Sequence, residues 1–132
     1  VFSDAHDLAR LGQMLLNKGS SLGINFFDLK ENTIKNWTQR AFPKGDNRRG
    51  IGFDKPALEY DHGPTCNLAS KSSFGHSGFT GTLLWVDPQY ELVYVFLSNR
   101  TYPDSENTKL ITMDVRTEIQ RVIMEQLNTP LR

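Results

Sequence analysis

Residues 74–82 read FGHSGFTGT and combine one histidine, one serine and three glycines within nine positions. An imidazole can carry protons and a hydroxyl can hydrogen-bond a substrate. Glycines allow a ligand to approach the backbone closely, and free N–H groups at such a place can stabilise an oxyanion. If the segment begins as a strand, His76 and Ser77 point to opposite faces. The alternative is a bend with an ordinary surface histidine, and spacing alone favours that alternative.

The other reactive side chains are scattered along the chain. The histidines and the acids next to them show no zinc-type spacing, so we expect no metal site; these residues are His6, Asp7, Asp61, His62 and His76. Cys66 is the only cysteine, which excludes a disulfide within the chain, and we expect it to have no catalytic role. Aromatic and methionine side chains fall where core packing is expected, so we expect no cofactor.

Composition excludes several classes of function. With 132 residues, 38% hydrophobic and 23% charged, the chain fits one globular domain. Fifteen basic residues balance fifteen acidic ones, so nothing calls for nucleic acid or an anionic membrane. A basic group at Lys44, Arg48, Arg49 and Lys55 is interpreted as solvated surface. The longest apolar run, LVYVFL, is too short to span a bilayer.

The first residues predict helical structure. The chain opens on VFSDAHDLARLGQMLLNKG, without an initiator methionine or a targeting segment, so we expect a piece of a longer protein. A helix is expected to begin near Ser3 or Asp4 and to end at Gly19. A second short helix is expected at 28–40, with Trp37 facing inward.

Strands are expected from residue 50 onward. A short strand is predicted at 50–54, and residues 81–87 and 91–99 are rich in β-branched and aromatic side chains. The Asp-Pro turn at 87–88 is short enough for a hairpin, so the last two strands are predicted to pair antiparallel. Because 91–99 is almost continuously apolar, we expect it to be central and covered on both faces.

A final helix is predicted over 108–127. Its expected apolar stripe consists of Ile111, Val115, Ile119, Val122, Ile123 and Leu127. The resulting fold class is α+β: an antiparallel sheet of three to four strands, one or more N-terminal helices, and a long C-terminal helix packed on the sheet. We expect a single partial domain, with a helical segment over 1–45, strands and loops over 46–107, and the helix over 108–127.

One family matches these elements in order. His76-Ser77-Gly78 resembles the third motif of serine β-lactamases and penicillin-binding proteins, usually Lys-Thr-Gly and in many relatives His-x-Gly. RRGIGF at 48–53 and LSNRTYP at 97–103 resemble a strand and a loop of that family, and the first and last helices agree with it. The resemblance implies a partial β-lactamase/transpeptidase-like fold.

The resemblance also implies roles for particular residues. It assigns catalytic roles to His76 and Ser77 and substrate-binding roles to Gly78, Phe79, Thr101 and Asp104, with the Phe79 N–H in the oxyanion hole. His76 replaces a lysine that stays charged, so we expect weaker attraction for a substrate carboxylate and activity that changes between about pH 6 and 7. Asp104 replaces an amide, which argues against β-lactam hydrolysis and favours esterase or peptidase activity.

The nucleophile is missing from the sequence. No serine has a lysine three residues later, and no Tyr-x-Asn motif is found. The resemblance therefore implies the C-terminal fragment of a serine hydrolase that acts on a small acyl or peptide-type substrate in the bacterial envelope or periplasm. The fragment alone is expected to be inactive. Alternatives are a non-catalytic binding or sensor module, or an accessory domain of a larger envelope enzyme.

The expected partners follow from the missing half. They are the N-terminal part of the parent chain, or a second copy in a homodimer, because a sheet without its N-terminal strands leaves an unpaired edge. We expect no nucleic-acid partner.

Overall fold

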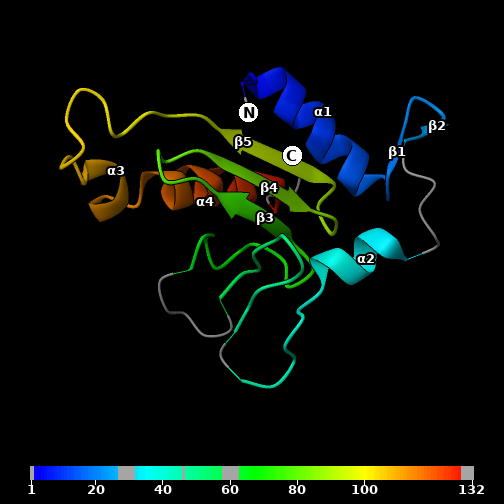
Figure 1. Ribbon diagram of the computed structural model, residues 1–132. Helices are drawn as coiled ribbons and strands as arrows, with labels where there is room; N and C mark the ends of the chain where they lie inside the picture. The colour runs from blue at the N-terminus through cyan, green and yellow to red at the C-terminus, as the bar shows by residue number, and fades with distance from the viewer. Residues whose placement is uncertain (1, 27–31, 46, 58–62, 129–132) are drawn as a thin grey trace.

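A computed structural model describes residues 2–26, 32–45, 47–57 and 63–128. In these residues two small antiparallel sheets lie among helices (Figure 1). The elements are α1 (Ala5–Leu16), β1 (Ser20–Ser21), β2 (Ile24–Asn25), α2 (Thr33–Thr38), β3 (Phe74–Ser77), β4 (Leu83–Asp87), β5 (Leu92–Phe96), α3 (Lys109–Thr112) and α4 (Val115–Leu127).

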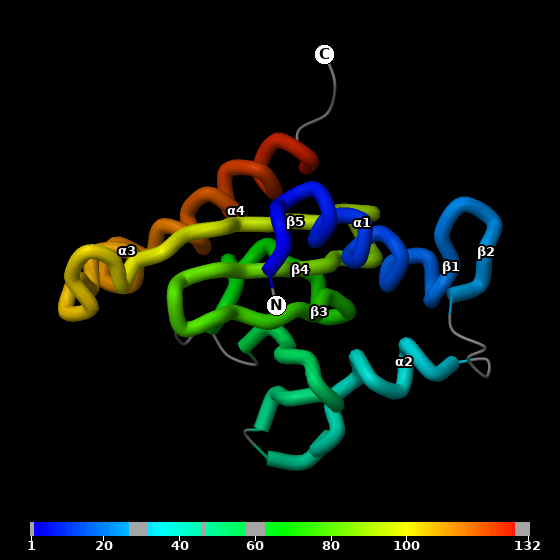
Figure 2. The backbone as a smooth tube through the Cα atoms, turned by 45° about the horizontal axis from the view of Figure 1, so that its top comes forward, coloured from blue at the N-terminus to red at the C-terminus, as the bar shows by residue number. Residues whose placement is uncertain are grey.

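The larger sheet has the order β3-β4-β5, and both pairings are antiparallel. α1 and α4 lie on opposite sides of it (Figure 2). Towards α1 the core consists of Met14, Leu15, Ile34, Phe74 and Val86, and towards α4 it consists of Leu83, Trp85 and Tyr94 with Ile123 packed against them. The predicted α+β class and the antiparallel hairpin of the last two strands are confirmed.

The N-terminal helix forms as its sequence predicts. The Asp4 carboxylate caps α1 by accepting a hydrogen bond from the Asp7 N–H at 2.9 Å. The helix ends before Gly19, whose φ of +95° suits glycine and whose N–H donates to the Met14 carbonyl. The second helix is shorter than the predicted 28–40: within the described residues it covers only Thr33–Thr38, and residues 28–31 lie outside them.

Two strand predictions are corrected. The segment 91–99 was expected to be central, but β4 is the central strand and β5 lies at the edge of the described sheet. The sequence of β5 is apolar because helices cover both of its faces, and not because a strand pairs with it on each side. In the segment 50–54 only Asp54 pairs, through a bridge to Gly75, and Gly52 has a φ of +77° that is incompatible with a regular strand.

The last helix is also different from its prediction. It is divided at Met113 and Asp114, and Asp114 has a left-handed φ of +51°, so α3 and α4 are separate. Much of the expected apolar stripe is exposed: Ile119 is 39% and Val122 56% exposed. The side chains fully buried on α4 are instead Gln120 and Met124. The cost of burying the Gln120 amide is offset by its Oε1, which accepts a hydrogen bond from the Cys66 N–H at 2.9 Å. None of the helices in the described part of the chain could cross a membrane.

Candidate active site

β3 presents the FGHSG motif at the outer edge of the sheet. Gly75 exchanges two main-chain hydrogen bonds with Asp54, at 2.7 and 3.1 Å. Since hydrogen-bonding directions alternate along a strand, the main chain of Ser77 faces the same edge two residues further on. Among the described residues no strand pairs with Ser77 on that side. The outer edge of β3 is therefore open at Ser77.

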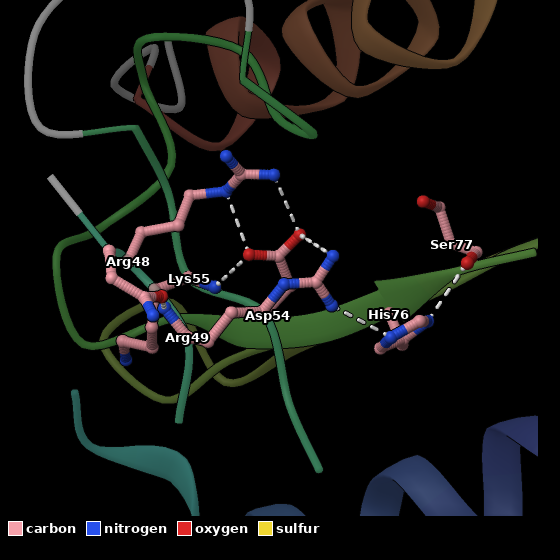
Figure 3. A network of polar contacts seen from close by, with 7 residues as sticks. Arg48, Arg49, Asp54, Lys55, His76 and Ser77 are labelled. Carbon is pink, nitrogen blue, oxygen red and sulfur yellow. Dashed lines mark hydrogen bonds and ion pairs between the residues drawn. The ribbon is translucent and has the colours of Figure 1, made fainter. Parts of the chain in front are cut away.

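Both ring nitrogens of His76 have polar partners (Figure 3). Its Nε2 lies 2.9 Å from Nη1 of Arg49, and its Nδ1 lies 2.8 Å from the Ser77 carbonyl oxygen. The ring is otherwise exposed. His76 is thus a surface side chain that is held in place by two directed contacts.

Arg49 reaches His76 from a group of charges around Asp54. The Asp54 side chain is only 4% exposed, and a buried carboxylate requires partners. Arg48 supplies two contacts to it, Nε at 2.7 Å and Nη2 at 3.0 Å, and Nη2 of Arg49 lies 3.7 Å away. We call Arg48, Arg49, Asp54 and His76 the His76 cluster.

Lys55 continues this cluster into the interior. It is buried, and its Nζ donates to the Ser72 carbonyl at 2.9 Å and lies 5.9 Å from the centre of the Phe74 ring. Burial lowers the pKa of Lys55 from 10.5 to about 8, partly opposed by the negative charge of Asp87. Asp87 in turn accepts two hydrogen bonds from Ser70. The irregular segment before β3 is thereby fixed to the end of β4.

A second set of contacts holds the turn after β3. Nε of Arg100 donates to the Phe79 carbonyl at 2.8 Å, and its guanidinium lies 4.5 Å from the centre of the Phe79 ring. The Thr80 carbonyl accepts hydrogen bonds from the Arg100 N–H at 3.0 Å and from the Ser98 hydroxyl at 3.1 Å. The Phe79 N–H donates to no acceptor among the described residues. We call Phe79, Thr80, Ser98 and Arg100 the Phe79 cluster.

The structure brings together only part of the predicted site. His76 and Ser77 lie on β3, and Gly78 follows them with its N–H bonded to the Thr82 carbonyl at 2.8 Å. The polar contacts of the other two residues are within their own loop: Thr101 donates to Asn99, and Asp104 accepts from the Glu106 N–H. Arg100, rather than Thr101 or Asp104, connects this loop to the motif.

Sequence reasoning missed Arg49, Asp54 and Arg100. Arg48 and Arg49 were interpreted as solvated surface because the chain is neutral and the segment is a loop. The available signal was the pair of arginines close to a single aspartate that follows an apolar, glycine-containing stretch. Such an aspartate is easily buried, and once buried it requires cations.

Of two pockets in the described residues, only the smaller borders the Phe79 cluster. A pocket of about 600 Å³ between α1 and α2 is lined by Leu15, Ile34 and Phe74, among others, and by none of the predicted site residues. The smaller pocket, beside α3, is lined by Ser98 and Arg100 of the Phe79 cluster but by neither Thr101 nor Asp104. The motif itself lies on a strand edge that no other described strand covers at Ser77.

Cys66 takes no part in the hydrogen bonds and ion pairs that hold the motif among the described residues. Cys66 is buried, and burial raises the pKa of its thiol, which keeps it protonated. Asp61 and His62 lie outside the described residues. Within those residues no group of three or more histidine, cysteine or acidic side chains could hold a metal ion.

A family model for β-lactamases matches residues 1–115. The chain belongs to the β-lactamase family. Its structure also resembles that of a β-lactamase from Mycobacterium bovis, with a TM-score of 0.69 and 25% sequence identity, over 96% of this chain and 45% of that one. The family resemblance of the sequence and the partial β-lactamase-like fold are both confirmed.

Two sequence relatives show how much of the family's length is present. An N-acetylmuramyl-L-alanine amidase of Bacillus subtilis is 37% identical over 105 residues, which are 77% of this chain and 22% of the relative. A protein of Salmonella typhi provisionally named D-alanyl-D-alanine carboxypeptidase is 37% identical over 111 residues, 83% of this chain and 24% of the relative. The chain spans about a quarter of the length of these curated relatives.

Proposed function

We propose that the chain supplies the third-motif wall of a serine hydrolase site, and that the rest of a parent chain supplies the nucleophile. The observation that carries this is the open outer edge of β3 at Ser77, followed by a Phe79 N–H with no acceptor among the described residues. Membership of the β-lactamase family supports it. No serine of the sequence precedes a lysine by three residues, so the Ser-x-x-Lys motif must come from elsewhere.

The chemistry proposed is acyl transfer through a serine. The serine Oγ bonds to the substrate carbonyl carbon, the bond to the leaving group breaks, and the leaving group takes up the serine proton. Water then releases the acid and restores the hydroxyl. The Phe79 N–H donates to the oxyanion, Ser77 and Gly78 border the substrate, and His76 lies beside the reacting serine. Thr101 and Asp104 approach the substrate from the loop after β5.

The substrate we propose is a small acyl or peptide-type molecule in the bacterial envelope or periplasm. The names of the two relatives refer to N-acetylmuramyl-L-alanine and D-alanyl-D-alanine, which are cell-wall groups. A carboxylate at Asp104 repels the carboxylate of a β-lactam, so esters, or peptides without a free carboxylate next to this loop, are the preferred substrates.

The test uses a chimera in which this chain replaces the matching quarter of the Bacillus subtilis relative. The 132-residue chain alone should hydrolyse neither nitrocefin nor p-nitrophenyl acetate above a His76→Ala control. The chimera should hydrolyse the ester and react with a fluorophosphonate that labels activated serines.

Phe79→Pro removes the proposed oxyanion donor, whereas Phe79→Ala keeps the N–H and serves as the matched control. In the chimera Phe79→Pro should lower kcat by about 100-fold or more, and Phe79→Ala by much less. Equal activities of the two variants, with circular dichroism unchanged, would exclude this role for the N–H.

We further propose that the free edge of β5 pairs with a strand from the rest of the parent chain and, when that strand is missing, with a second copy. Val93 and Val95 direct their main-chain groups away from β4, because Leu92, Tyr94 and Phe96 occupy the alternate positions. Light scattering at tens of micromolar should detect a dimer. Val95→Pro, which removes only an outward N–H, should make it monomeric; a wild-type monomer would contradict this pairing.

A further inference from the structure

The contacts of His76 determine where its proton lies. A guanidinium only donates hydrogen bonds, so Nε2, at 2.9 Å from Arg49, must be the accepting, unprotonated nitrogen. A carbonyl oxygen only accepts, so Nδ1, at 2.8 Å from the Ser77 carbonyl, must carry the hydrogen. The two contacts independently require the same neutral Nδ1–H tautomer.

Arg49 is itself positioned by the strand that carries His76. Its second guanidinium nitrogen lies 3.7 Å from the Asp54 carboxylate. The main chain of Asp54 exchanges two hydrogen bonds with that of Gly75, the residue before His76. Arg48 holds the same carboxylate in a two-point contact and makes no contact with His76 in the described residues. The position of Arg49 therefore follows from the sheet pairing.

We propose that Arg49 is a positioning residue that fixes His76 as the Nδ1–H tautomer and supplies the positive charge at the first position of the motif. This inference rests on the proposed function for its catalytic meaning. With both nitrogens occupied, His76 offers no free atom for moving protons, and it directs its hydrogen bond to the carbonyl of Ser77. The Arg49 side chain is 49% exposed and its guanidinium is permanently charged, so the cation faces solvent beside the open strand edge.

This changes one expectation from the sequence. Replacing lysine by histidine suggested a motif without a fixed charge, and hence weak attraction for an anionic group. Arg48, Arg49 and Asp54 together carry one net positive charge next to His76. The structure assigns the charge to the segment before β3 instead of to the motif itself.

Nitrogen-15 NMR of the labelled 132-residue chain tests the tautomer directly. The spectra are recorded at pH 8, and a His76→Gln variant identifies the signals of His76. We expect Nε2 of His76 in the unprotonated range and Nδ1 in the protonated range. The opposite assignment in the wild-type chain would overturn the proposal.

The variants then separate Arg49 from its surroundings. Arg49→Gln should weaken the Nδ1–H signature and give a mixture of tautomers, because glutamine can both donate to and accept from Nε2, which leaves the Ser77 carbonyl as the single contact that selects Nδ1–H. Arg49→Lys, a donor without an acceptor, should restore the signature. Arg48→Gln is the matched control, since it touches the same carboxylate but not His76, and it should leave the signature unchanged. Equal effects of Arg48→Gln and Arg49→Gln would overturn the proposal in favour of general loop packing.

The tautomer measurement does not depend on catalysis. An inactive chimera whose His76 is an Nδ1–H tautomer would refute only the proposed hydrolase function. An active chimera whose His76 carries its proton on Nε2 would refute only the role of Arg49.

Discussion

The two ends of the motif are stabilised in different ways. At the His76 cluster, side chains from residues 48–54 hold the motif through charges gathered on a carboxylate that is only 4% exposed. At the Phe79 cluster, contacts end on main-chain carbonyls of an exposed turn, and the Phe79 ring is 79% exposed. The His76 cluster depends on a few particular side chains, whereas the Phe79 cluster depends largely on main-chain hydrogen bonds.

This difference separates two tasks of the proposed wall. A fixed charge and a single tautomer require side chains that cannot easily rearrange, which burial of Asp54 provides. An oxyanion donor requires only a backbone N–H in the correct direction, which a turn held by main-chain hydrogen bonds provides. Side-chain substitutions should therefore lower the free energy of unfolding more at the His76 cluster than at the Phe79 cluster.

The largest effect is expected for Asp54→Asn. This substitution leaves the two arginines beside a neutral amide. Because the arginines are partly exposed, we expect the free energy of unfolding to fall by about 2–3 kcal/mol, which is below the usual range for fully buried pairs. Urea unfolding followed by circular dichroism measures it.

The matched control is Asp104→Asn in the loop after β5. Asp104 is exposed, and its carboxylate accepts one hydrogen bond within its own loop, so we expect the free energy of unfolding to change by about 0.5 kcal/mol or less. Similar losses of unfolding free energy for the two aspartates would contradict the special role given to the buried Asp54 carboxylate.

The sequence predicted those features that depend on local pattern. The first helix has a capping aspartate and a terminal glycine, and the hairpin has an Asp-Pro turn between two apolar runs, so both were predicted correctly in kind. The edge position of β5 could not be predicted, because helices that cover both faces give a strand the same apolar sequence as neighbouring strands do.

Only those residues of the candidate site that are adjacent in the sequence could be predicted. His76, Ser77 and Phe79 were singled out because they are adjacent in one motif. Arg49 lies 27 residues before His76, and no local pattern connects the two. On α4, Gln120 is buried through a bond to the main chain of Cys66, 54 residues away, which hydrophobic periodicity cannot predict. Contacts between distant polar groups were the missing information.

An intermediate effect on the free energy of unfolding is expected from Lys55, which lies on the interior side of the His76 cluster. Its pKa in the folded state is about 8, below the ordinary 10.5, so the folded state binds fewer protons than the unfolded state between these values. The contribution of Lys55 to stability should therefore rise as pH increases through this window. The stability of the wild type relative to Lys55→Met should increase by about 1–2 kcal/mol from about pH 7.5 to 9.5.

Urea unfolding of both proteins at the two pH values gives this difference. Cys66 and Tyr94 also have shifted pKa values, but both proteins share them, so they cancel in the comparison. A difference that stays constant with pH would show that Lys55 keeps its ordinary pKa in the folded state.

Among the residues whose side chains contact the motif, the smallest effect on stability is expected for Arg100→Ala at the Phe79 cluster. It removes one hydrogen bond to the Phe79 carbonyl and an exposed cation–π contact, while the main-chain bond from Arg100 to Thr80 remains, so we expect a loss of about 1 kcal/mol or less. Hydrogen exchange of the Arg100 amide should nevertheless accelerate severalfold, because its acceptor lies in the turn that the side chain holds. Arg10→Ala on the exposed face of α1 is the control and should leave that exchange unchanged. If Arg100→Ala destabilised the protein as much as Asp54→Asn, the turn would depend on a side chain after all, and the two ends of the motif would be built alike.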